Sequence, residues 1–330
     1  MCSGFTPDRW LSACSLCPRA CGASRAEAVA SAFCGEAADL RLAWAGLHFG
    51  EEPPVTGAGG SGTVFVTGCN LRCSFCQNRQ ISQEGMGAPV SRGAFAGICL
   101  ALEKAGAENI NIVTGSHAVP ALADGLREAR ERGLSVPVLW NSSAYESVTT
   151  LRRLEGLVSV WLPDFKSMDA DFSAAVFRAR DYPQRAAEAL LYMAETSPLS
   201  FGPARSGSTE VLRSGVIVRH LALPGRLADT ESVLRWYKEN LDGRALLSLM
   251  TQYTPIPGSP AVPFPDRFTE QEEYGSLLAF LEQLDIGDGF LQELNPDDEW
   301  LPDFSREQPF SSDLARPVWH WKTGFLPAVR

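Results

Sequence analysis

Three cysteines, Cys69, Cys73 and Cys76, lie within eight residues of one another in FVTGCNLRCSFCQNRQ, directly after an apolar run. Three thiols are one too few for a closed tetrahedral metal site and an odd number for disulfides. Thiolates suit iron–sulfur clusters and zinc. Four cysteines usually hold a four-iron cluster, so three would leave one iron open to a substrate or cofactor. The spacing predicts a catalytic [4Fe-4S] cluster; the alternative is a structural metal completed by a distant residue.

A second group of thiols, Cys14, Cys17, Cys21 and Cys34, is a complete set of four. Structural zinc favours two pairs of ligands, whereas here three cysteines cluster and the fourth is distant, which is closer to ferredoxin-like usage. The group therefore predicts either a second iron–sulfur cluster or a zinc ion. Both hypotheses remain open at the level of the sequence.

The composition limits the class of protein. The 330 residues are 45% hydrophobic and 21% charged, which is typical of a soluble globular protein. A formal net charge of -10 argues against a chain built around nucleic-acid binding. No apolar run approaches the roughly 20 residues of a membrane span, and the N-terminus does not resemble a secretory signal. Clustered thiols in a large chain predict metal ligands in the reducing cytoplasm, not a disulfide scaffold.

The elements that must position these thiols alternate along the chain between strand-like and helix-like segments. Apolar runs predict strands at 63–67, 110–113, 136–140, 157–162, 215–223 and 245–250. Helical spacing predicts helices at 91–106, 118–132, 145–155, 184–196, 229–241 and 269–284, with Ser91 as the cap of the first. A stretch rich in Gly, Ser and Pro at 197–214 predicts a loop. Strands that alternate with helices imply a parallel sheet.

Polar residues follow nearly every predicted strand, and this placement bears on the architecture. The groups are Thr67-Gly68-Cys69, Thr114-Gly115-Ser116-His117, Asn141-Ser142-Ser143, Asp164-Phe165-Lys166, Arg219-His220 and Thr251-Gln252-Tyr253. In α/β barrels the active site is built at this end of the strands, whereas an open doubly wound sheet has its site at one switch point. The sequence therefore predicts an α/β fold with a partial TIM-type barrel of six strands and helices.

The loop C-x3-C-x2-C, with Phe75 before its last cysteine, resembles the signature of the radical S-adenosylmethionine (SAM) superfamily. The stretches GTVFVTGCNLRCSFCQN, PDFK and VRHLALPG resemble the activating enzymes of glycyl radical enzymes, in the branch called pyruvate formate-lyase-activating-enzyme-like, or PflX-type. The resemblance covers most of the chain from residue 14 to about 284. It implies that SAM binds the open iron and is reductively cleaved to a 5′-deoxyadenosyl radical, which abstracts hydrogen from a substrate.

The resemblance also implies which residues contact the cofactors. A Gly-Gly-Glu-like turn that binds the SAM amino group is replaced here by TGSHA, so Thr114 and Ser116 become candidates. The other candidates for cofactor binding are Phe75, Asn78, Asn141, Ser142, Asp164, Lys166, Arg219, His220 and Gln252. For Asp164 and Lys166 the alternative is a solvated ion pair, and for His220 it is a packed core histidine.

Three regions follow from the pattern: a Cys-rich extension at 1–60, the partial barrel at 61–284 and an aromatic-rich tail at 285–330 that carries Trp300, Trp319 and Trp321. In the extension, HFGEEPP is either a polar loop or part of the barrel mouth. The tail stretch PVWHWKTGF is expected to plug the open barrel side, to form a partner surface or simply to pack. A plug would favour a small substrate.

Three functions remain open at this point. The first is an activase that abstracts hydrogen from a glycine of a glycyl radical enzyme. The second is a radical SAM enzyme that modifies a small molecule or peptide, and the third is a non-enzymatic iron–sulfur or zinc protein. Expected partners are SAM and an electron donor such as flavodoxin or ferredoxin, and a glycyl radical enzyme in the first case. No membrane and no nucleic acid is expected.

Overall fold

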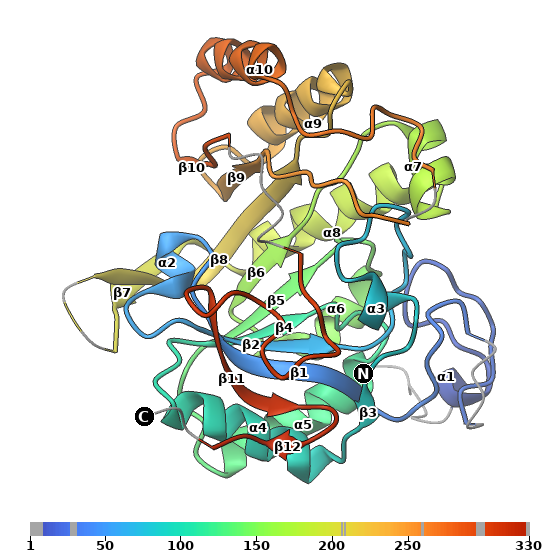
Figure 1. Ribbon diagram of the computed structural model, residues 1–330, viewed down its shortest axis with the longest axis vertical. Coiled ribbons are helices and arrows are strands. Elements are labelled where there is room, and N and C mark those ends of the chain that lie inside the picture. The colour runs from blue at the N-terminus through green and yellow to red at the C-terminus, as the bar shows by residue number, and fades with distance from the viewer. Residues whose placement is uncertain are drawn as a thin grey trace.

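The computed structural model describes residues 9–26, 32–205, 207, 209–258, 261–294 and 301–327 (Figure 1). Trp300, one of the tryptophans expected to mark the tail, lies outside the described residues. The division of the chain at residues 60 and 284 stays a prediction.

Parallel strands form the centre of the molecule. They follow the order β9-β8-β6-β5-β4-β2, and a further strand, β10 (Gly289–Leu291), pairs parallel with β9 at the outer edge. The bounds are β2 (Ser61–Val66), β4 (Ile110–Val113), β5 (Val138–Ser142), β6 (Val160–Pro163), β8 (Glu210–Leu221) and β9 (Leu246–Met250). The two ends of the sheet do not pair with each other among the described residues. The predicted α/β fold with a partial barrel is confirmed.

Helices cover the outer face of this sheet, as expected from their apolar spacing. They are α4 (Arg92–Lys104), α5 (Val119–Glu131), α6 (Val148–Leu151) with the 3-10 turn η1 (Arg152–Leu154), α8 (Tyr182–Thr196), α9 (Leu227–Asn240) and α10 (Gln271–Leu284). The Ser91 hydroxyl accepts from the Ala94 amide at 3.2 Å, so the predicted cap of α4 is confirmed. The helix α7 (Ala170–Phe177) was not predicted from the sequence. Short helices complete the set: α1 (Arg9–Ser12), α2 (Pro53–Thr56) and α3 (Arg79–Ser82).

The prediction of a loop at 197–214 was wrong. Here β7 (Ser200–Pro203) pairs antiparallel with the first half of β8 and forms a two-stranded arm. The side chains of β7 are mostly exposed, so the segment lacks the apolar alternation by which strands are found in a sequence. Backbone pairing with the long strand β8 holds the arm in place.

Antiparallel strands from both ends of the chain extend the sheet beyond β2. The strand β1 (Arg41–His48) pairs with β2, β3 (Ala88–Pro89) pairs with β1, and β11 (Ala315–His320) pairs with the other side of β1. The strand β12 (Gly324–Phe325) pairs with β11. Residues of the tail also cross in front of the strands, where Phe304 and Phe310 pack on Trp44 and Phe65 (Figure 1). The tail is therefore built into the sheet.

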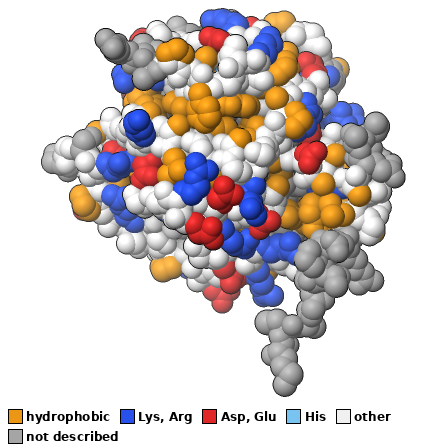
Figure 2. All heavy atoms as spheres, turned by 90° about the horizontal axis from the view of Figure 1, so that it is seen from below, with side chains coloured by type: hydrophobic (Ala, Val, Ile, Leu, Met, Phe, Trp, Pro, Cys, Tyr) orange, Lys and Arg blue, Asp and Glu red, His pale blue; other side chains and the backbone are white. Residues whose placement is uncertain are grey.

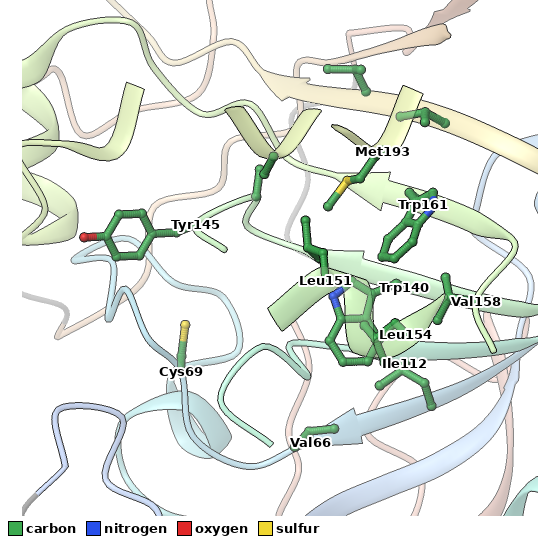
Figure 3. Packing of buried hydrophobic residues seen from close by; sticks show 14 of the residues in the cluster. Val66, Cys69, Ile112, Trp140, Tyr145, Leu151, Leu154, Val158, Trp161 and Met193 are labelled. Atoms are coloured by element: carbon green, nitrogen blue, oxygen red, sulfur yellow. The ribbon is translucent and has the colours of Figure 1, made fainter. Parts of the chain in front are cut away.

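The core lies between the sheet and its helices. In Figure 3, Trp140 of β5 and Trp161 of β6 pack with Leu151 and Leu154, while Cys69 lies on the loop beyond the end of β2. Every residue of β2, β4 and β6 is buried, as expected for parallel strands covered on both faces. These rigid strands fix where the loops at their carboxyl ends begin.

The surface shows no dominant field of one charge on the face drawn in Figure 2, where acidic and basic side chains alternate around apolar strips. Within the described part of the chain, no helix combines the length and the apolar character that crossing a membrane requires.

Candidate functional site

A cavity of about 480 Å³ opens at the carboxyl ends of the parallel strands. Cys69, Cys73 and Cys76 all lie on its wall. The other predicted site residues on this wall are Asn78, Thr114, Asn141, Ser142, Asp164, Lys166, Arg219 and Gln252. The fold thus gathers residues from five strand ends and the three-thiol loop around one space.

The geometry of the three-thiol loop follows from local backbone features. Gly68 takes a φ of 87°, and a Cβ at this position would lie 2.4 Å from Glu36 Cγ, so only glycine fits. Arg72 also has a positive φ of 60°, which turns the chain between the first two cysteines. The Cys76 amide donates to the Cys73 carbonyl at 3.3 Å and closes the second turn. These turns bring the thiols to one side of the loop.

The donor set fits an iron–sulfur cluster. The Leu71 amide donates to Cys69 Sγ at 3.4 Å, and Cys76 Sγ lies 3.2 Å from the Ser82 hydroxyl. Burial raises the pKa values of Cys73 and Cys76, so their thiolates need a positive partner such as a metal centre. Among the described residues, no three His, Cys, Asp or Glu side chains converge closely enough to hold a single ion. In a cluster each thiolate binds a different iron, so three thiols would leave one iron open.

Phe75 lies behind the loop and lines a second cavity of about 190 Å³. Its ring meets the rings of Tyr253, Phe264 and Phe177 edge-on, at centroid distances of 6.1, 5.8 and 6.2 Å. Cys73 and Cys76 lie on the walls of both cavities. The aromatic residue of the motif thus supports the loop from the apolar side.

Asp164 and Lys166 form an ion pair at the end of β6, with Lys166 Nζ 2.6 Å from Asp164 Oδ2. Burial acts to lower the pKa of Lys166, but the Asp164 carboxylate and the Cys73 thiol outweigh burial and raise it. The Tyr182 hydroxyl accepts from the Lys166 amide at 2.9 Å and donates to the Asp164 carbonyl at 2.8 Å. The pair is held in the cavity wall, unlike the freely solvated ion pair that was the alternative.

Arg219 of β8 joins the barrel to the HFGEEPP stretch. Its guanidinium donates from Nε to Glu52 Oε1 at 2.9 Å and from Nη2 to both Glu51 and Glu52. Asn111 Nδ2 donates to Glu51 Oε1 at 3.1 Å. Burial acts to raise the pKa of Glu52, but Arg219 outweighs it and lowers the pKa. His48, Glu51 and Glu52 line the cavity, so the placement of this stretch at the barrel mouth is confirmed.

The ends of β4 and β5 present backbone and amide groups to the cavity. Thr114 has a φ of 62°, an unusual conformation for a β-branched residue, and its amide donates to the Asn141 carbonyl at 2.9 Å. The Ser142 hydroxyl donates to Glu146 Oε2 at 2.7 Å and accepts from the Ala144 amide. Strained residues cluster at functional sites, and Thr114 stands where the resemblance implies a contact to SAM.

Two predicted site residues lie elsewhere. Ser116 is buried and bonds to Glu146, and it is absent from the walls of the described cavities. His220 is also buried; its Nδ1 lies 2.7 Å from the Phe165 carbonyl and its Nε2 3.0 Å from the Thr230 hydroxyl. Both contacts are within the core, which is the alternative that the sequence left open for this histidine.

Phe310 of the tail also lines the cavity, a position that the sequence did not indicate. The ring centroids of Phe310 and Phe65 lie 5.6 Å apart. The two residues are more than 200 positions apart in the sequence, so no local pattern predicts this contact. The tail therefore forms part of the wall of the site.

The four N-terminal thiols meet at a small cavity of their own. Its wall is formed by Cys14, Leu16, Cys17, Arg19, Cys21, Arg25, Phe33, Cys34, Asn70 and His117. Cys14 is buried, Cys17 and Cys34 are partly buried, and Cys21 is exposed. The fold thus brings together all four cysteines that the sequence grouped.

Comparisons with known proteins bear on the first thiol group. Residues 55–171 match the family model described as a 4Fe-4S single cluster domain, over just above a third of the chain. This match includes Cys69, Cys73 and Cys76 and supports an iron–sulfur cluster there. An uncharacterized protein of Methanocaldococcus jannaschii is 28% identical over 248 residues, which is 73% of this chain and 66% of the relative. This chain spans just under two thirds of that relative's length.

Solved structures give more distant similarities. SuiB of Streptococcus suis is 11% identical with a TM-score of 0.47, over 68% of this chain and 47% of SuiB. Methylornithine synthase (PylB) is 14% identical with a TM-score of 0.47, over 71% of each chain. The hydrogenase maturase HydG of Carboxydothermus hydrogenoformans is 15% identical with a TM-score of 0.45, over 69% of this chain and 52% of HydG. The chain spans about half the length of SuiB and HydG, and similarity at this level says nothing about activity.

Proposed function

We propose that this protein is a radical SAM enzyme whose [4Fe-4S] cluster is held by Cys69, Cys73 and Cys76. The observation that carries the proposal is a set of three thiols, with no fourth among the described residues, on the wall of a cavity of about 480 Å³. When bound, the cluster and SAM supply a 5′-deoxyadenosyl radical by one-electron reductive cleavage. The matched 4Fe-4S domain supports the cluster, and the motif resemblance supports SAM.

The protein's own residues bind and orient the cofactors in this proposal. Thr114 and Asn141 present groups at adjoining strand ends, where the SAM amino acid and ribose would need hydrogen-bond partners. Lys166, held by Asp164, places a positive charge near Cys73 and favours its thiolate. The network of Arg219, Glu51 and Glu52 fixes the far wall.

The substrate in this proposal is a small molecule or a short peptide. The support comes from the tail, because β11 covers the free side of β1 and Phe310 occupies part of the cavity wall. A wall built from the chain's own tail leaves less room for a loop of a folded partner. Activation of a glycyl radical enzyme is the other candidate, and it rests on the motif resemblance alone.

The cofactor assignment is tested with anaerobically reconstituted protein. We expect the wild type to form 5′-deoxyadenosine and methionine from SAM with dithionite, and Cys73→Ala to form none. Cys99→Ala is the matched control, because Cys99 is a buried thiol of α4 outside the site. Undiminished 5′-deoxyadenosine formation by Cys73→Ala would show that the central assignment is wrong.

The substrate class is tested with pyruvate formate-lyase as the probe. We expect 5′-deoxyadenosine to form without a glycyl radical in the electron paramagnetic resonance (EPR) spectrum of the mixture. A glycyl radical signal that depends on this protein and on SAM would instead establish the activase function.

A further inference from the structure

The N-terminal thiol cavity shares a wall with the first thiol loop. Cys69 faces the large cavity, whereas its neighbour Asn70 lines the small one. The Cα atoms of these two consecutive residues are about 3.8 Å apart. A single turn of backbone therefore separates the two cavities at this point. Across the same partition, the Cys34 carbonyl lies 3.0 Å from where a Cβ of Gly68 would be. The glycine before Cys69 therefore permits the close approach of the two thiol groups.

Local hydrogen bonds gather the four thiols from two loops. The Cys14 amide donates to the Ala23 carbonyl and the Gly22 amide to the Cys14 carbonyl, both at 3.0 Å, which closes the loop that carries three of them. The Ala38 amide donates to the Arg25 carbonyl at 2.9 Å. This bond holds the segment that carries Cys34 next to the first loop. The arrangement is thus a feature of the fold.

Arginine side chains hold this region against the barrel. Arg19 donates to the carbonyls of Asn70 at 2.8 Å and Phe177 at 2.7 Å. Arg25, which is 2% exposed, donates to the carbonyls of Ala37 and His117. The bonds to Asn70, His117 and Phe177 reach outside the N-terminal segment, whereas the bond to Ala37 lies within it. The small cavity is therefore fixed relative to the first thiol group.

Two side chains of the small cavity have polar atoms without a partner in the described structure. Asn70 is 1% and His117 is 3% exposed, and their Oδ1 and Nδ1 atoms make no hydrogen bond. His117 Nε2 donates to the Thr67 carbonyl at 2.8 Å, so in a neutral ring Nδ1 is a bare acceptor. Buried polar atoms are nearly always paired, and an absent ion or group is one reason for an exception. Both atoms offer lone pairs, so they indicate that a hydrogen-bond donor or a metal centre belongs in this cavity.

The order of the thiols along the chain favours a cluster over zinc. Three cysteines lie within eight residues and the fourth follows thirteen residues later, whereas structural zinc favours two pairs of ligands. This layout is closer to ferredoxin-like usage, in which each cysteine binds its own iron. All four thiols line one small cavity.

We propose that Cys14, Cys17, Cys21 and Cys34 bind a second four-iron cluster, through which electrons reach the cluster on Cys69, Cys73 and Cys76. The direction of transfer follows from exposure, since Cys21 is at the surface and Cys73 is buried. One electron from a one-electron reductant such as dithionite reduces the second cluster, which is reoxidised when it reduces the first. The transfer step rests on the proposed function; the second cluster site does not.

Metal analysis of reconstituted protein tests the site. We expect about eight irons per chain in the wild type, and about four in both Cys14→Ala/Cys17→Ala and Cys73→Ala/Cys76→Ala. Cys99→Ala should keep all eight. A wild type with about four irons, with or without one zinc, would overturn the proposal even if the variants fail to fold. Eight irons without SAM cleavage would overturn the proposed function and leave the second site standing.

EPR spectroscopy of the reduced protein tests the relation between the clusters. Two reduced clusters on either side of one backbone turn interact magnetically, so the wild-type spectrum should differ from the sum of the two variants' spectra. We also expect reduction of the first cluster by limiting dithionite to slow at least tenfold in Cys14→Ala/Cys17→Ala. Additive spectra, or an unchanged rate of reduction, would refute transfer through the second cluster.

Discussion

The two thiol groups of this protein differ in number of ligands and in the space beside them. The group with three cysteines faces about 480 Å³ lined by charged and polar strand ends, whereas the group with four surrounds about 10 Å³. A missing thiol is useful only where a cofactor can reach the open position. The comparison teaches that ligand count and cavity volume together distinguish a thiol group that a cofactor can reach from a group that is enclosed by the protein.

The largest effect on the free energy of unfolding is expected from replacing the buried arginine beside each thiol group. Arg219 beside the first group binds two carboxylates, while Arg25 beside the second binds backbone carbonyls. Arg219→Met leaves Glu51 and Glu52 buried without a cation, and we expect a loss of about 3–5 kcal/mol of unfolding free energy. Arg25→Met leaves the carbonyls of Ala37 and His117 unpaired, while Glu36 keeps Arg41 as its partner, so it should cost roughly 2–3 kcal/mol. Denaturant unfolding measures both.

The pH dependence of these variants sharpens the contrast. Without Arg219, burial would raise the pKa of Glu52 above that of the unfolded chain. A carboxyl group whose pKa is raised on folding stabilises the protein at pH values below its pKa in the unfolded chain, and this stabilisation is lost as the pH rises. The free energy of unfolding of Arg219→Met should therefore be lower at pH 8 than at pH 5. Arg25→Met also removes a charge that lowers the pKa of buried Glu36, but Arg41 still pairs with Glu36 at 3.1 Å, so the pH dependence of this variant should be weaker. Equal pH profiles for the two variants would contradict the role assigned to the arginine of the first site.

The next effect concerns the cation of the first site. Lys166→Met removes the positive charge near Cys73 and the partner of Asp164. A charge-assisted hydrogen bond is worth about 1.5–3 kcal/mol, so SAM cleavage should fall roughly 10- to 100-fold. Lys104→Met is the control, because Lys104 is exposed at the end of α4. The iron of the N-terminal group should be unchanged in both variants; its loss in Lys166→Met would mean that the regions are not separable.

The sequence predicts more about the first region than about the second. The cysteine spacing and the polar residues after each strand predict a shared site, because the carboxyl ends of parallel strands meet at one edge. Eight predicted contact residues line the cavity together with the three cysteines. Phe75 lines the second cavity instead. Ser116 and His220 line neither of these two cavities, since a single sequence cannot show which way a side chain next to a strand end turns.

Contacts between distant segments are what the sequence could not give. The bond from His117 to Thr67 and the approach of Cys34 to Gly68 join loops that no local pattern relates. The same holds for Phe310 against Phe65 and for the pairing of β11 with β1. Each of these contacts arises from tertiary packing, and each decides how a thiol group is enclosed.

The smallest effect is expected at a site remote from both thiol groups. Glu273 in the first turn of α10 accepts from Arg267 Nη1 at 2.8 Å and from the Gly225 amide at 2.7 Å. Hydrogen bonds from Arg267 are the main reason that its pKa is lowered to about 2. A lowered carboxyl pKa gives stability above pH 4.5 that is lost as pH falls toward 2. Because Glu273 is partly exposed, we expect Glu273→Gln to cost only about 1–2 kcal/mol at pH 7.

The difference between this variant and the wild type should therefore shrink as the pH is lowered from 7 toward 2, as followed by thermal unfolding. Glu272→Gln is the matched control, since Glu272 is its exposed neighbour in the same turn. Iron content and SAM cleavage should stay at wild-type values in both variants, because neither residue lines a thiol cavity. A loss of iron from either thiol group in Glu273→Gln would show that general stability, and not the local enclosure of each group, determines cluster retention.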